Sequence, residues 1–200
     1  RPAGAQEGRP ARRQQAQEAV TLSSPRGEET AAIARQLIRD VPDFPTPGVM
    51  FKDMTPLFAD GAAMRRVIDW FVDGQPDGFD IVAGIEARGL VLAGGIAQAT
   101  GVGLIPVRKS GKLPRSTLSE SYALEYGEAT LEIHTDAVAA GTRVLIVDDV
   151  LATGGTIEAT LALMQRAGAK VAGVAVVLEL GFLGGRERLA PLAVEALVRA

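Results

Sequence analysis

Three uninterrupted runs of apolar residues alternate with segments of helical periodicity along most of the chain. The runs end at Ile85, Val147 and Leu178, and a shorter run precedes Arg108. A strand that is apolar at successive positions must be buried on both faces, which is typical of a parallel sheet covered by helices on each side. The sequence therefore predicts an α/β fold with a parallel-sheet core flanked by helices. The predicted strands cover residues 79–85, 103–107, 143–147 and 171–178, and the helices between them cover 90–100 and 155–166.

The beginning of the chain differs in composition from the rest. Residues 1–29 are rich in Arg, Gln, Ala, Gly and Pro and have no sustained apolar face, so they cannot bury enough surface to become ordered. We predict a disordered tail at 1–29 and one folded domain at 30–200, a length that suits a single core. A solvated extension is the favoured interpretation of the tail, and an arginine-bearing interaction arm is the alternative.

Two further segments frame the predicted sheet. A helix from residue 30 should stop near Pro42, because the position before a proline disfavours helix, and 61–72 has the spacing of a helix with one apolar face. The proline-rich stretch 44–56 between them predicts a rigid loop. Further on, period-two alternation on both sides of Gly127 predicts a β-hairpin outside the parallel order, at residues 119–126 and 129–135.

Charge and composition narrow the classes of function. The net charge of −3 argues against a nucleic-acid surface, which is normally basic. The chain has no cysteine, which excludes disulfides and thiolate nucleophiles. Its apolar runs are too short to span a bilayer. We expect a cytoplasmic protein without nucleic-acid or membrane partners.

Two adjacent acids, Asp148 and Asp149, follow the buried run that ends at Val147, and the turn 152–156 (Ala-Thr-Gly-Gly-Thr) comes directly after them. A glycine turn that enters a helix offers free amides and the positive end of the helix dipole to an anion. Two carboxylates beside an anion site would repel the ligand unless it also carries hydroxyl donors or a metal ion. A sugar phosphate held at its 5′ end would bring its 2′ and 3′ hydroxyls to the acids. Either acid alone has the alternative of capping the next helix.

Two other polar loops follow predicted strands. Residues 86–89 (Glu-Ala-Arg-Gly) open a helix and place Arg88 beside free amides, although Arg88 pairing with Glu86 is the alternative. Residues 107–114 hold three cations next to a glycine and a proline, which suits a movable segment. Ligands of open parallel sheets bind at the carboxyl ends of the strands. The three loops together predict a ribose with phosphate at one end and a second anionic group at the other.

These segments resemble a known family. The stretch 144–156 resembles the phosphoribosyl-pyrophosphate signature of type I phosphoribosyltransferases. The stretches 44–53, 108–114 and 121–127 are similar to the adenine-specific members of that family, and the similarity extends from about residue 33 to the end of the chain. The resemblance implies the type I phosphoribosyltransferase fold, with a mobile hairpin over the active site. It also implies purine salvage, in which adenine and phosphoribosyl pyrophosphate give AMP and pyrophosphate.

The resemblance assigns roles to residues of this chain. Asp148 and Asp149 would hold the ribose hydroxyls, directly or through water on Mg²⁺, and Glu125 with Tyr126 would be the catalytic acid and its neighbour on the closing loop. Arg88 would face the pyrophosphate and take part in catalysis, with a peptide of the 86–88 loop often cis in the family. The remaining implied ligands fall into three sets. They are Ala152, Thr153, Gly154, Gly155 and Thr156 for the 5′-phosphate, Lys109 and Lys112 as helpers at the pyrophosphate, and Met50, Phe51, Lys52 and Leu180 for adenine.

Relatives in the family are homodimers, so a homodimer is expected. Met50 and Lys52 differ from the Val and Arg often found at these positions, which is tolerable if main-chain atoms recognise adenine. Two alternatives stay open at this point: a 6-oxopurine phosphoribosyltransferase, and a phosphoribosyl-pyrophosphate-binding regulator without catalysis. The regulator would need a DNA-binding module and a basic face, which 30 residues and a negative net charge do not supply.

Overall fold

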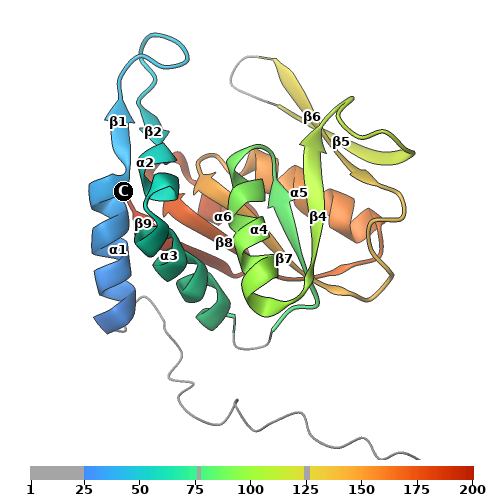
Figure 1. Ribbon diagram of the computed structural model, residues 1–200. Helices are drawn as coiled ribbons and strands as arrows, with labels where there is room; N and C mark the ends of the chain where they lie inside the picture. Colours follow the sequence, from blue (N-terminus) through green and yellow to red (C-terminus); the bar gives the residue numbers. More distant parts are fainter. Residues whose placement is uncertain (1–24, 76–77, 124–126) are drawn as a thin grey trace, which may run out of the picture.

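The computed structural model describes residues 25–75, 78–123 and 127–200. Within them, one seven-stranded sheet has the order β5-β6-β4-β3-β7-β8-β9 (Figure 1). The strands are β3 (Ile81–Ile85), β4 (Gly103–Lys109), β5 (Thr117–Ala123), β6 (Glu128–His134), β7 (Arg143–Leu151), β8 (Lys170–Glu179) and β9 (Val194–Arg199). The five strands from β4 to β9 pair in parallel, and the continuous apolar runs predicted four of them, β4, β3, β7 and β8.

Helices cover both faces of this sheet. They are α1 (Pro25–Leu37), α2 (Thr55–Ala59), α3 (Gly61–Asp73), α4 (Arg88–Thr100), α5 (Gly155–Arg166) and α6 (Gly185–Leu189), with a short 3₁₀ turn η1 (Gly181–Leu183). Alternate residues of each central strand enter two cores: Leu145 packs with α1, α3 and α4, whereas Ile146 packs with α5 and α6. The predicted α/β fold, a parallel-sheet core flanked by helices, is confirmed.

The β5–β6 hairpin extends the sheet at one edge. Its strands are antiparallel to each other, and β6 pairs antiparallel with the end of β4 through Arg108 opposite Glu132. The predicted position outside the parallel order is confirmed, although the hairpin continues the main sheet instead of standing apart from it. Its predicted mobility stays a prediction.

The first elements depart from the sequence-based boundaries. The helix predicted from residue 30 begins at Pro25, because proline suits the first turn of a helix, so the predicted tail is wrong for residues 25–29. It ends at Leu37 instead of near Pro42, because Arg39–Val41 forms β1, which pairs antiparallel with β2 (Phe51–Asp53). Residues 1–24 lie outside the described part of the chain.

The acid pair lies inside a strand instead of after it. The strand predicted at 143–147 continues to Leu151, because its parallel pairing with β8 runs on to Leu151 opposite Glu179. The sequence also did not predict β9 and α6. No helix of the described residues is long and apolar enough to cross a membrane.

Candidate active site

Asp148 and Asp149 lie at the carboxyl end of β7, which is flanked by β3 and β8 in the middle of the parallel strands. The backbone of α4 packs directly against them. A Cβ atom on Gly89 would lie 2.7 Å from the Val147 carbonyl oxygen and 3.1 Å from Asp148 Oδ1. Glycine at the start of α4 therefore lets the 86–89 loop approach the acid pair, and two of the three predicted loops meet at one point.

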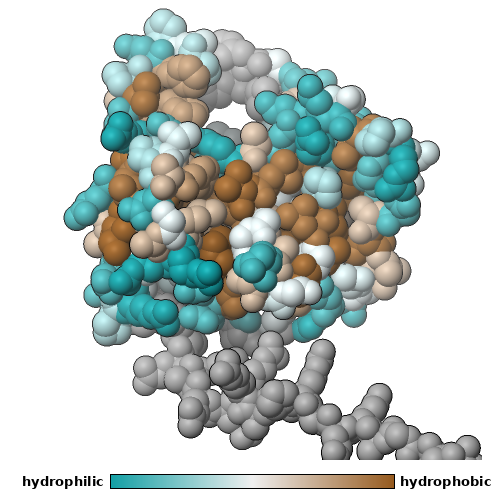
Figure 2. Space-filling view, viewed as in Figure 1, coloured by the Kyte–Doolittle hydropathy of each residue, from teal (hydrophilic) through white to brown (hydrophobic). Residues whose placement is uncertain are grey.

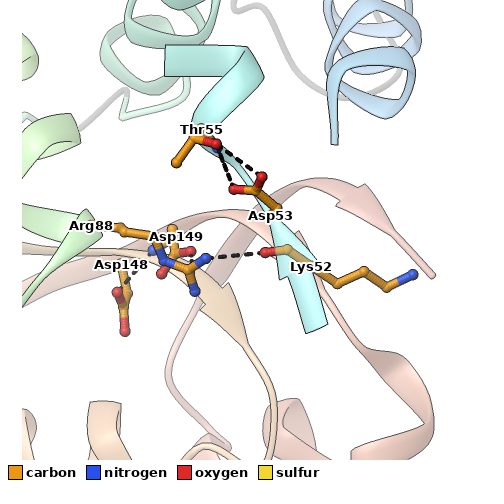
Figure 3. A network of polar contacts seen from close by, with 6 residues as sticks. All are labelled: Lys52, Asp53, Thr55, Arg88, Asp148 and Asp149. Atoms are coloured by element: carbon orange, nitrogen blue, oxygen red, sulfur yellow. Dashed lines mark hydrogen bonds and ion pairs between the residues drawn. The ribbon is translucent and has the colours of Figure 1, made fainter. Parts of the chain in front are cut away.

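Arg88 joins the acid pair to the early loop of the chain (Figure 3). Its Nη2 lies 2.8 Å from Asp149 Oδ2, and its Nη1 donates to the Lys52 carbonyl oxygen at 3.0 Å. The guanidinium carbon also lies 4.9 Å from the centroid of the Phe51 ring, a cation–π distance. The alternative partner considered for Arg88, Glu86, is instead paired with Arg108.

The charges of the acid pair are only partly compensated by the protein. Burial raises the pKa of Asp148 above its ordinary value, and the neighbouring charge of Asp149 raises it further. Burial also raises the pKa of Asp149, against the opposing effect of the Arg88 cation. Asp149 Oδ2 makes its ion pair with Arg88 but has no hydrogen bond of good geometry within the described residues. Such carboxylates favour a ligand that brings hydroxyl donors or positive charge.

The turn 152–156 enters α5 as predicted. Gly154 has φ +83°, and no side chain caps the helix, so the first amides of α5 face outward for an anion. The Thr156 hydroxyl donates to the Tyr122 hydroxyl at 3.3 Å. The geometry at the helix start is that of an anion site, and a side chain from β5 reaches it.

A second glycine, in α6, packs against the backbone of the turn 152–156. A Cβ atom on Gly185, the first residue of α6, would lie 2.2 Å from the Ala152 carbonyl oxygen and 3.1 Å from the Gly154 amide nitrogen. Both neighbours are backbone atoms that cannot move without moving the turn. No local sequence pattern indicates this contact, because α6 itself was not predicted.

The cationic loop begins on β4 and is held from two sides. Glu86 Oε2 accepts from Arg108 Nε at 2.8 Å and from the Lys109 amide at 2.9 Å. These bonds lower the pKa of Glu86, the hydrogen bond from Arg108 most of all. Lys109 itself is exposed.

Glu132 on β6 holds the next turn of the same loop. Glu132 is 9% exposed, and its carboxylate accepts from Ser110 Oγ at 2.8 Å, from the Gly111 amide at 3.0 Å and from Ser119 Oγ at 3.3 Å. These hydrogen bonds, led by the one from Ser110, lower the pKa of Glu132. The sequence analysis did not single out Glu132, although three partners make it the main support of the segment before Lys112.

The early loop contributes the segment predicted to bind adenine. Met50 is 50% exposed, while Phe51 and Lys52 lie in β2 and are half-buried. The Phe51 ring packs edge-to-face on Phe44 at a centroid distance of 4.9 Å. The Lys52 ammonium pairs with Asp40 at 2.7 Å, so its side chain is engaged within the loop while its carbonyl faces Arg88.

Leu180 follows β8, and its amide donates to the Leu151 carbonyl oxygen at 2.9 Å. It therefore lies beside the end of β7, close to the start of the phosphate turn. The peptide between Glu86 and Ala87 is cis, as the family resemblance implied for this loop. Glu125 and Tyr126 lie outside the described residues, so their predicted roles stay predictions.

Comparison with known proteins decides the family. Residues 57–191 match the phosphoribosyl transferase domain family. The adenine phosphoribosyltransferase of Salinispora tropica is 66% identical over 174 residues, which are 86% of this chain and 92% of that protein. The chain belongs to the adenine phosphoribosyltransferase family. Members of this family are transferases of purine salvage, and the alternative of a 6-oxopurine enzyme is not retained.

Solved structures of the adenine phosphoribosyltransferase family share the fold. The Rhodothermus marinus enzyme has a TM-score of 0.82 and 47% identity, covering 86% of this chain and 99% of that one. The enzyme of Saccharomyces cerevisiae, complexed with an imino-altritol bisphosphate and adenine, has a TM-score of 0.80 and 35% identity, covering 85% and 99%. The type I phosphoribosyltransferase fold predicted from the sequence is confirmed.

Proposed function

We propose that this chain transfers the 5-phosphoribosyl group of phosphoribosyl pyrophosphate to adenine, giving AMP and pyrophosphate. The observation that carries the proposal is the meeting of the acid pair, the uncapped start of α5 and the Arg88 loop at one edge of the sheet. This arrangement, in a chain 66% identical to an adenine phosphoribosyltransferase, offers a ribose site between two anion sites.

The substrate would lie across the edge of the sheet. The 5′-phosphate accepts hydrogen bonds from the amides of the turn 152–156 and from the Thr153 hydroxyl, and Asp148 and Asp149 accept from the ribose hydroxyls. The pyrophosphate group faces the 86–89 loop and the ammonium groups of Lys109 and Lys112. The bond from ribose C1 to the pyrophosphate oxygen breaks, and the oxygen keeps the electron pair. Cations and amides beside this leaving group stabilise its charge.

Adenine would enter between the early loop and the edge of the sheet. Main-chain groups near Met50 and Lys52 bind the adenine edge, and the Phe51 ring and Leu180 line its faces. N9 forms the new bond to ribose C1 and gives up its proton, for which Glu125 is the acceptor. Because Arg88 contacts both the Lys52 carbonyl and Asp149, it sets the distance between the adenine loop and the ribose site.

Magnesium is the proposed cofactor. The described residues contain no group of three or more His, Cys, Asp or Glu that could hold a metal by themselves. Mg²⁺ is commonly bound by one or two carboxylates together with substrate phosphates, so the pair Asp148–Asp149 fits an ion that arrives on the substrate. The ion would neutralise the charge of the pyrophosphate group.

The proposed function is tested by a spectrophotometric assay with phosphoribosyl pyrophosphate, Mg²⁺ and, separately, adenine, hypoxanthine, guanine and xanthine. AMP formed with adenine alone is the expected result. Tight binding of phosphoribosyl pyrophosphate with no product from any base would contradict transfer and support the regulator.

The role of Glu125 has its own test. Glu125→Gln should lower kcat by about a hundredfold, since general acid–base catalysis contributes on this order. The affinity for phosphoribosyl pyrophosphate, measured by calorimetry, should stay within about twofold. A normal kcat would remove Glu125 from the mechanism.

We also propose that the chain is a homodimer. Figure 2 shows apolar residues gathered across the face that α4 crosses in Figure 1. Val91, on α4, is 49% exposed, and Gly94 and Gln98 are exposed along the same side of the helix. After Arg88, α4 has no charged residue. A helix with an uncharged exposed side is typical of a subunit interface.

A further inference from the structure

Tyr122 on β5 contacts the first turn of α5, where the 5′-phosphate is placed. Its hydroxyl oxygen lies 3.3 Å from Thr156 Oγ1. A Cβ atom on Gly155 would lie 3.3 Å from Tyr122 Cδ2, so the ring lies against the glycine of the phosphate turn. The ring is half-buried and packs on the core beneath α5. The hairpin therefore places an aromatic side chain at the anion site.

The hydroxyl of Tyr122 has a hydrogen left to donate. In its contact with Thr156 the threonine hydroxyl is the donor, and Tyr122 is the acceptor. A phenol also carries one O–H donor of its own. This donor stands beside the uncapped amides of α5, which already favour an anion. A phosphate oxygen held by those amides is the complementary acceptor.

Strand β5 contacts α5 near both ends of the helix. At the far end of the helix, Arg166 Nη1 donates to the Ser119 carbonyl oxygen at 2.6 Å and to Glu120 Oε2 at 2.9 Å. The contact of Tyr122 with Thr156 fixes β5 at the other end. Since β5 contacts α5 at both ends, the Tyr122 hydroxyl lies beside the first turn of α5 in this structure.

We propose that Tyr122 is a further ligand of the 5′-phosphate, donating its hydroxyl hydrogen to a phosphate oxygen held by the turn 152–156. The contact makes the hairpin part of the phosphate site. This inference rests on the proposed function, because the 5′-phosphate is that of phosphoribosyl pyrophosphate. According to this proposal, Tyr122 binds only the 5′-phosphate end of the substrate, and other residues bind the pyrophosphate end.

Tyr122→Phe tests the proposal, because it removes the hydroxyl and keeps the ring. Ribose 5-phosphate and pyrophosphate are titrated separately into the wild-type and variant proteins by calorimetry. The Kd for ribose 5-phosphate should rise about tenfold, which is typical for the loss of a hydrogen bond to a charged group. The Kd for pyrophosphate and the KM for adenine should stay within about twofold.

Ser121→Ala is the matched control. Ser121 is the neighbouring residue of β5, and its hydroxyl pairs with that of Thr130 on β6 at 2.8 Å. Successive residues of a strand point to opposite faces, so this change should leave both Kd values unaltered. An unchanged Kd for ribose 5-phosphate in Tyr122→Phe would overturn the proposal, and so would equal weakening of both ligands. A wild-type protein that binds ribose 5-phosphate but forms no AMP would overturn the proposed function alone.

Discussion

Asp148 and Asp149, the proposed ribose ligands, lower the stability of the folded protein when they are ionised. Burial raises the pKa of both, and for Asp148 the charge of Asp149 adds to the effect. The folded state therefore holds the Asp148 proton more tightly than the unfolded chain, in which the pKa is near 3.8. The free energy of unfolding falls as pH rises from this value through the raised folded pKa. At neutral pH the ionised pair is destabilising, which is expected of groups kept for a ligand.

Asp148→Asn should make the protein more stable and less active at pH 7. The free energy of unfolding should rise, since the substitution removes a buried charge whose ionised form destabilises the folded state at pH 7. The asparagine Oδ1 keeps the bond that Asp148 Oδ1 accepts from the Asp149 amide at 2.9 Å. The kcat/KM for phosphoribosyl pyrophosphate should fall about 10- to 100-fold through loss of a charged acceptor. Urea denaturation at pH 7 and pH 4 measures the first effect, and the difference between the proteins should narrow at pH 4.

Asp80→Asn is the control substitution, for which we expect the opposite change in stability at pH 7. The exposed Asp80 pairs with Arg143 at 2.7 Å, and this hydrogen-bonded contact lowers its pKa to about 2. A lowered folded pKa contributes stability above the unfolded pKa, and this contribution is lost as pH falls. Asp80→Asn should therefore lower stability slightly at pH 7 and leave activity unchanged. An Asp148→Asn protein that is less stable than wild type at pH 7 would contradict the account of the acid pair.

At the scale of elements, the contact between Gly185 of α6 and the phosphate turn leaves no room for a side chain at position 185. Gly185→Ala places a methyl group against the Ala152 carbonyl oxygen and the Gly154 amide, so the turn must shift. The free energy of unfolding should fall by about 1–3 kcal/mol, as for overpacking of a dense interior. The KM for phosphoribosyl pyrophosphate should rise about tenfold, since the amides that hold the 5′-phosphate move. Steady-state kinetics and thermal denaturation measure the two effects.

Gly61→Ala is the matched control for this substitution. Gly61 begins α3, and a Cβ atom there would meet nothing within 4 Å. Alanine is a better helix former than glycine, so stability should stay equal or rise by up to about 1 kcal/mol. Kinetics of Gly61→Ala should match wild type. If Gly185→Ala also left the KM unchanged, α6 would not support the phosphate turn.

The elements best predicted from the sequence are those whose own pattern determines them. Helix α5 was predicted with its observed bounds, and β3, β4, β7 and β8 were found from their continuous apolar runs. The elements that were missed depend on distant partners. The short strand Phe51–Asp53 exists through pairing with Arg39–Val41, and its proline-rich surroundings conceal it. Because two acids follow Val147, the predicted strand ends there, whereas pairing with β8 extends β7 to Leu151.

The candidate site shows the same division. The acid pair, the glycine turn and the Arg88 loop could be found because each follows a strand in the sequence. The bond from Arg88 to the Lys52 carbonyl joins residues 36 positions apart, and no local pattern indicates it. Glu132 and Tyr122 look like ordinary strand residues until the hairpin is placed against β4 and α5.

At the scale of the whole molecule, the predicted tail should be dispensable. The sheet, both cores and the proposed ligand sites are formed by residues from Pro25 onward. Deletion of residues 1–24 should therefore leave kcat/KM within about twofold and the thermal midpoint within a few degrees. The deleted and full-length proteins are compared in the same assay and by scanning calorimetry. A large loss of activity would assign the tail a role that its composition does not predict.

The uncharged side of α4 gives the last prediction, which concerns the homodimer. A charge buried at a subunit interface without a partner is strongly unfavourable, so Val91→Glu should shift the protein from dimer to monomer. Sedimentation velocity at several concentrations measures the shift. Gln36→Glu adds the same charge on the exposed side of α1 and should leave the dimer intact. Because α4 begins at Arg88, loss of the dimer should also raise the KM for phosphoribosyl pyrophosphate if the interface helps to hold that loop. A Val91→Glu protein that sediments as wild type would place the interface on another face.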